Sequence, residues 1–129
     1  MKRLLKIPVL VAALCIGMMA HADFALPYGL ASPPDSTLVI GDVFDSAGGD
    51  REESIARFST SASRQDSIEF YTLALEKVGF EIYSSSDTEK RAMIAGKRAD
   101  DRVTVYFKDE SDWAEAGESE ISVHAVYNK

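Results

Sequence analysis

The chain has almost none of the side chains from which nucleophilic and metal sites are built. Its 129 residues include one cysteine, Cys15, and two histidines, His21 and His124. A zinc site needs three or four ligands, and a serine nucleophile needs a base and an orienting acid. No Gly-x-Ser-x-Gly motif is present, and a lone strand histidine such as His124 is typically solvated or hydrogen-bonded. We therefore predict no enzyme activity, catalytic residue, cofactor or metal.

The first 22 residues have the three parts of a secretory signal peptide. Three basic residues fall within the first six positions, and Val9 to Ala20 is an apolar run without a charge. Ala20-His21-Ala22 places small residues at the −3 and −1 positions of a cleavage site. The run is shorter than the roughly 20 residues that span a bilayer. We predict cleavage after Ala22 and an exported protein, periplasmic or secreted.

Cys15 does not lie in a lipidation motif. A lipobox has a small residue before its cysteine, whereas Leu14 precedes Cys15, and Cys15 lies inside the apolar run. We therefore expect no stable membrane anchor after cleavage. Residues 23–129 then hold no cysteine, so the core of this domain is predicted to be stable without a disulfide.

Residues 23–129 are strongly acidic. The leader holds three of the 14 basic residues and none of the 21 acidic ones, which leaves a net charge of −10. Such a surface repels nucleic acid and anionic lipid headgroups, and we predict neither as a partner. The charge suits a basic protein partner, and solubility alone is the alternative explanation.

The strongest local signal is one amphipathic helix. Ser63 is a good N-cap, and Asp66 three residues later acts as a shortened capping box. Gly79 fits the left-handed C′ position, with Phe80 folding back onto Leu75 to close a Schellman motif. The apolar side chains recur at spacings of three and four along one stripe, at Ile68, Tyr71, Leu75 and Val78.

The rest of the chain alternates like a sheet. Strands are predicted over 37–44, 53–60, 80–83, 91–97, 103–108 and 121–127, with polar turns at 45–50 and 84–89. The proline-containing segment 23–36 is predicted to be an extended lead-in over the edge of the core. Half-polar strands indicate an antiparallel sheet with one wet face, and the helix is expected to cover the other face. We predict a single α+β domain over 37–129, two-layered, with one main helix on about five or six antiparallel strands.

The region around the helix resembles small uncharacterised bacterial exported and envelope domains. Their pattern is Phe-x-Thr, a short Ser/Asp turn, then Phe-Tyr-x-x-x-Leu-x-x-x-Gly-Phe or Trp. The matching residues here are Phe58-Ser59-Thr60, Ser63, Asp66, Phe70-Tyr71, Leu75 and Gly79-Phe80. The resemblance implies a helix packed on a curved antiparallel sheet, and it brings no catalytic residue with it.

Two aromatic side chains are candidate partner-binding residues. Trp113, in the acidic loop 109–120, either tucks against the sheet edge or is exposed as a binding anchor. Phe70 lies outside the apolar stripe, and it either extends the buried face or marks a partner surface. The carboxylates of the loop also raise a calcium hypothesis, although the spacing of an EF-hand is missing.

These observations lead to two hypotheses of function. The first is a non-enzymatic envelope protein that binds a protein or peptide through its sheet face or an open edge. An acidic inhibitor or immunity-type protein that masks a basic enzyme surface is the sharper form of this hypothesis. The alternative is a small-molecule or lipid carrier with an apolar pocket between helix and sheet.

Overall fold

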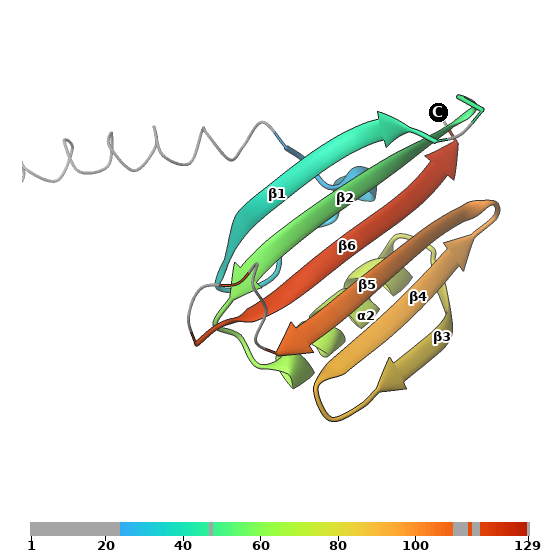
Figure 1. The fold of residues 1–129 in the computed structure, drawn as a ribbon. Helices are drawn as coiled ribbons and strands as arrows, with labels where there is room; N and C mark the ends of the chain where they lie inside the picture. The colour runs from blue at the N-terminus through green and yellow to red at the C-terminus, as the bar shows by residue number, and fades with distance from the viewer. Residues whose placement is uncertain (1–23, 47, 110–113, 115–116, 129) are drawn as a thin grey trace, which may run out of the picture.

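The computed structural model describes residues 24–46, 48–109, 114 and 117–128 (Figure 1). The predicted signal peptide and Trp113 lie outside the described residues. After a single 3-10 turn, the elements are β1 (Ser36–Asp45), β2 (Arg51–Thr60), α2 (Arg64–Lys77), β3 (Glu81–Asp87), β4 (Arg91–Arg98), β5 (Asp101–Asp109) and β6 (Ser119–Asn128). Within the described part of the chain, the helices are too short or too polar to span a membrane.

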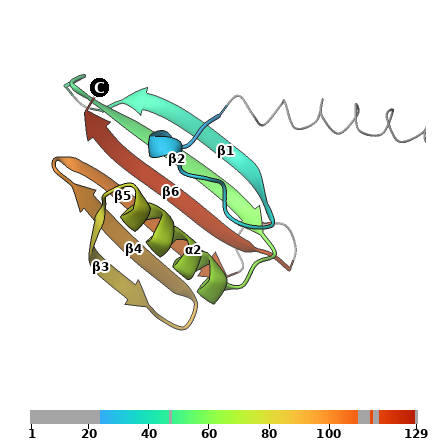
Figure 2. The same ribbon diagram turned by 180° about the vertical axis from the view of Figure 1, so that it is seen from behind.

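The strands form one antiparallel sheet of six strands in the order β1-β2-β6-β5-β4-β3. Strand β6, the last along the chain, inserts between β2 and β5, while β1 and β3 form the two edges (Figure 1). The helix packs against one side of this sheet (Figure 2). The prediction of a two-layer α+β fold is confirmed.

The predicted turn over 84–89 is wrong for its first half. Residues 84–86, three consecutive serines, belong to β3 and pair with Ala95, Ile94 and Met93 of β4. Pairing with a neighbouring strand satisfies the backbone hydrogen bonds whatever the side chains are, so tertiary context overrides the low strand preference of serine. The turn itself is confined to the residues between Asp87 and Arg91.

Helix α2 begins and ends where the sequence predicts. The Ser63 hydroxyl accepts a hydrogen bond of 3.1 Å from the Asp66 backbone N–H. At the other end Gly79 adopts a φ of 92°, and the Phe80 N–H donates to the Leu75 carbonyl at 3.0 Å. This bond belongs to the Schellman motif that was predicted for these residues.

The helix covers one half of the sheet, over β3, β4 and β5 (Figure 2). Tyr71 and Leu75, in the middle of the predicted stripe, are 0% exposed, and Ile68 and Val78 pack against the same core. Arg64 in the first turn anchors the helix to the sheet, donating to the carboxylates of Asp87 and Asp109.

Residues 24–34, hereafter the strap, lie over the other half of the same side (Figure 2). Leu26 and Leu30 are buried in the core that the helix also covers. The single 3-10 turn of the strap, Pro27–Gly29, was not predicted. At its centre Tyr28 adopts a φ of 63°, and its hydroxyl donates to the Asp101 carboxylate at 2.7 Å.

Arg98 joins the strap to the end of the helix. Its guanidinium lies 4.7 Å from the centre of the Tyr28 ring and 5.1 Å from that of Phe80. It also donates to the Val78 carbonyl, at the C-terminus of α2, at 2.7 Å. Helix and strap therefore form a continuous cover over one side of the sheet, which we call the inner face.

The two faces of the sheet differ in what covers them. The inner face is buried, with its core side chains at Ala56, Phe58, Ala92, Ile94, Val103, Val105, Phe107, Ile121, Val123 and Ala125. The opposite side, which we call the open face, is turned away from α2 and the strap (Figures 1 and 2). The exposed side chains Tyr106, Arg91 and Lys108 lie on this open face.

Candidate functional site

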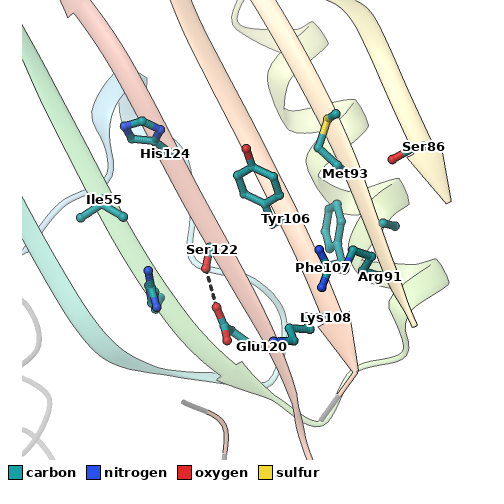
Figure 3. A pocket seen from close by; sticks show the side chains of 12 residues that line it. Ile55, Ser86, Arg91, Met93, Tyr106, Phe107, Lys108, Glu120, Ser122 and His124 are labelled. Carbon is teal, nitrogen blue, oxygen red and sulfur yellow. Dashed lines mark hydrogen bonds between the residues drawn. The ribbon is translucent and has the colours of Figure 1, made fainter. Parts of the chain in front are cut away.

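The open face carries a hollow of about 470 Å³ that crosses β2, β6, β5 and β4 (Figure 3). The strand register explains how it is assembled. Tyr106 of β5 lies opposite Ser122 of β6 and Met93 of β4, and Ser122 lies opposite Arg57 of β2. Because directly opposite residues point to the same face, this row of side chains runs across four strands.

Apolar side chains form part of the lining of the hollow. Ile55, Met93 and Tyr106 line it from three different strands. The Tyr106 ring is 49% exposed, whereas the neighbouring Phe107 ring, on the inner face, is 2% exposed. Ser122 is a small buried side chain in the middle of the row. Large side chains on the outer strands around a small central one leave room for an apolar group.

One end of the hollow is positively charged. Arg91 and Lys108 are direct cross-strand partners on β4 and β5, and both line the hollow. Neither side chain forms an ion pair with a described carboxylate, although Glu120 of β6 lies opposite Lys108. Like charges placed directly opposite each other destabilise a sheet. This end of the hollow therefore presents two adjacent cations, Arg91 and Lys108.

Two carboxylate contacts define the polar side of the hollow. The Ser122 hydroxyl donates to Glu120 Oε2 at 2.6 Å, and both side chains are buried (Figure 3). His124 Nε2 lies 2.9 Å from Glu53 Oε1. His124 lines the hollow, on the side of β6 opposite to the buried Val123 and Ala125.

These contacts do not form a nucleophilic triad. The Ser122 hydrogen is used by Glu120, and no hydrogen bond joins Ser122 to His124. A serine nucleophile requires a base within hydrogen-bond reach of its own hydroxyl. The arrangement can hold polar groups of a ligand. That the protein is not an enzyme stays a prediction.

The residues predicted to bind a partner lie elsewhere. Phe70 is on α2, on the other side of the sheet from the hollow, half-buried against the core with its ring centre 5.0 Å from that of Tyr71. Trp113 and most of the acidic loop lie outside the described residues. Of the described loop carboxylates, Asp109 pairs with Arg64 at 2.7 Å and Glu118 accepts from Ser59 at 2.6 Å.

Metal binding finds no support in the described ranges 24–46, 48–109, 114 and 117–128. They contain no group of three or more histidine, cysteine or acidic side chains that could hold an ion. The calcium hypothesis concerns the loop 109–120, of which residues 110–113 and 115–116 are not described. It therefore remains a sequence-based prediction.

The sequence contains one signal of the hollow, in the alternation of two strands. The alternation in 103–108 places Tyr106 and Lys108 on the wet face, and the same alternation in 91–97 places Arg91 and Met93 there. A large aromatic ring and a methionine on a solvent-facing side of a sheet are unusual enough to indicate a binding surface. Their convergence depends on the register between strands.

Comparison with known proteins identifies a family. A family model described as START domain-like matches residues 40–120, more than half of the chain, and the chain belongs to this family. No curated protein and no solved structure matches the chain. The matched segment contains most of the lining of the hollow, and Ser122 and His124 follow it directly. The membership agrees with the predicted likeness to a small uncharacterised domain, while the motif and export stay predictions.

Proposed function

We propose that this member of the START domain-like family binds a small molecule with an apolar body in the hollow of the open face. The hollow itself carries the proposal. Its volume of about 470 Å³ lies within the roughly 300–1,000 Å³ of small-molecule sites, which combine apolar walls with a few placed polar groups. The family match is compatible with a ligand-binding fold.

This proposal moves the ligand from the place that the sequence suggested. The carrier hypothesis put an apolar pocket between helix and sheet, where Tyr71, Leu75 and Phe107 are at most 2% exposed. A ligand there would have to displace these three side chains, at a cost of several kcal/mol for each large apolar group removed from the core. The open face requires no such displacement.

Met93 allows a direct test of the site. It is one of four methionines, the others being Met1, Met18 and Met19, so a ¹³C-methyl label gives few signals and Met93→Leu assigns one of them to the hollow. Decanol, below its solubility limit, and decanoate, below its critical micelle concentration, are titrated into the full chain. We expect a saturable shift of the Met93 methyl signal.

Two variants locate the binding. Tyr106→Ala removes an apolar wall, and we expect it to weaken binding about tenfold, equal to ~1.4 kcal/mol. Leu73→Ala is the matched control, because Leu73 is 60% exposed on the helix, on the far side of the sheet. An unmoved Met93 signal with both probes, or a loss of binding in Leu73→Ala alone, would refute the proposal.

A second candidate function is the binding of a protein or peptide partner along β1. This edge strand has ten residues and contains neither lysine nor proline, the residues that commonly protect an exposed edge. Its apolar side chains Val39, Ile40, Val43 and Phe44 are between 37% and 44% exposed. An extended segment of a partner can add to such an edge through main-chain hydrogen bonds.

A comparison of edge variants tests this second function. The chain and its Val43→Lys variant are used to retain proteins from a bacterial envelope extract, with Leu73→Lys as a control of equal charge change. We expect a partner that binds along β1 to be retained by the original chain and by the control. We expect the Val43→Lys variant not to retain it. Equal retention by all three would place the partner elsewhere, and binding insensitive to salt would argue against a basic partner.

A further inference from the structure

The cationic end of the hollow has a further consequence, which rests on the proposed function. We infer that the ligand carries a carboxylate, held between Arg91 and Lys108, next to its apolar body. Directly opposite residues of an antiparallel pair have Cα atoms roughly 4.5–5.5 Å apart, and these two are such a pair. Both side chains are exposed and line the hollow.

The charge of the hollow contrasts with that of the whole protein. Its lining includes three cationic side chains, Arg57, Arg91 and Lys108, and one carboxylate, Glu120. With His124 neutral, these groups sum to a local charge of +2, in a chain whose net charge is −7. A concentration of positive charge in a hollow of an acidic protein attracts an anion to that place.

Glu120 is the group that could oppose an anion, since it lies opposite Lys108 on β6. Its side chain is buried, and Oε2 already accepts the Ser122 hydrogen bond. Arg91 is one strand farther away, on β4. The anion is therefore expected on the β4 side of Lys108, where Arg91 can offer two parallel N–H donors to a carboxylate.

The rows of the sheet fix the orientation of the ligand. The next side chains on the same face are Met93 and Tyr106, two residues along each strand and one row from Arg91 and Lys108. Two residues of a strand correspond to roughly 6.6 Å. A carboxylate held by the two cations thus places the adjoining apolar group over Met93 and Tyr106. The ligand class is a carboxylate with an apolar chain or ring.

The test compares decanoate with decanol, which share a chain and differ in charge. At neutral pH and low salt, we expect decanoate to bind at least tenfold more tightly than decanol, read from the Met93 methyl signal. In the double variant Arg91→Gln with Lys108→Gln, the preference is expected to fall to within about threefold. Lys90→Gln is the matched control, because Lys90 precedes Arg91 and does not line the hollow.

Each outcome has a separate meaning. Equal binding of the two probes to the original chain overturns the carboxylate inference and leaves the proposed function standing. A preference for decanoate that survives the double variant, or falls equally in Lys90→Gln, shows that the anion is not held by Arg91 and Lys108 and also overturns it. No shift of Met93 with either probe refutes the proposed function as well.

Discussion

The inner and open faces of the sheet consist of alternate residues of the same six strands. On β5, Val103, Val105 and Phe107 are at most 2% exposed, while Tyr106 between them is 49% exposed. The helix and the strap exclude water from the first set, whereas the exposed Tyr106 lies in the hollow, whose lining also includes part of Phe107. Neighbouring positions on one strand therefore differ in role: the inner ones are packed in the core, and the open ones line the proposed binding site.

This separation has a physical origin. Burial stabilises by about 25 cal/mol for each Å² of apolar surface removed from water, so the covered face carries most of the stability. Side chains on the uncovered face add little to stability, and the fold tolerates a like-charged pair such as Arg91 and Lys108 there. Variants that change one face at a time test this difference in stability between the inner and open faces.

The largest effect is expected for adjacent aromatic residues on β5. Phe107→Ala removes a ring from the inner face, and we expect the free energy of unfolding to fall by about 3–5 kcal/mol. Tyr106→Ala is the matched change on the open face and is expected to cost about 1 kcal/mol or less. Urea denaturation measures both. Equal losses would mean that the open face is as tightly packed as the inner one.

A smaller effect of opposite sign is expected at Ser67. Its hydroxyl is buried beneath α2 and has no hydrogen-bond partner among the described residues, which costs free energy in a dry layer. Ser67→Ala removes this group and raises helix propensity, so we expect a gain of about 0.5–1 kcal/mol in urea denaturation. Ser86→Ala on the open face is the control, with a change within about 0.5 kcal/mol. A loss of stability in Ser67→Ala would reveal a partner for the hydroxyl.

The smallest effect is a loss of stability in alkali. Burial raises the pKa of Tyr71 above its ordinary value, which is about 10. The folded chain therefore keeps this proton more tightly than the unfolded chain. The stabilisation is complete below pH about 10 and decreases as the pH rises further. From pH about 9.5 to about 10.5, we expect a loss somewhat below 1 kcal/mol for this group.

Urea denaturation at several pH values measures this slope, and Tyr71→Phe is the control. The variant loses the hydrogen bond of 2.9 Å from the Tyr71 hydroxyl to the Ala31 carbonyl, so its stability is lower at every pH. Its decrease across the alkaline range should nevertheless be shallower than that of the original chain. An unchanged slope would show that the ring oxygen is hydrated, and that the inner face is wetter than we describe.

Local signals were sufficient to predict most of the fold. The ends of α2 follow from Ser63 and Gly79, whose preferences act within one helical turn. The positions of the strands along the chain, before and after the helix, follow from alternation within each strand. The place of β6 between β2 and β5 was not predicted. The serine segment of β3 was missed because its strand conformation depends on β4, and propensity does not include a partner strand.

The hollow could not be predicted in the same way. Ile55 and His124 are direct partners, although the sequence separates them widely, and pairing of distant strands has no local signature. Alternation along β5 separates Tyr106 and Lys108 from the buried positions of the strand, yet it gives no indication that Arg91 and Met93 would lie beside them. The bond of His124 to Glu53 depends on the same long-range register.

The contacts of the strap limit the order in which the domain can fold. Tyr28, near the beginning of the described chain, bonds to a residue 73 positions later, and its ring lies 5.8 Å from that of Tyr127 on the last strand. Strand β2 also has only β1 as a neighbouring strand until β6, the last strand, has been synthesised. Closing such long loops slows folding. The contact between Tyr28 and Tyr127 can therefore form only after the last strand has been synthesised.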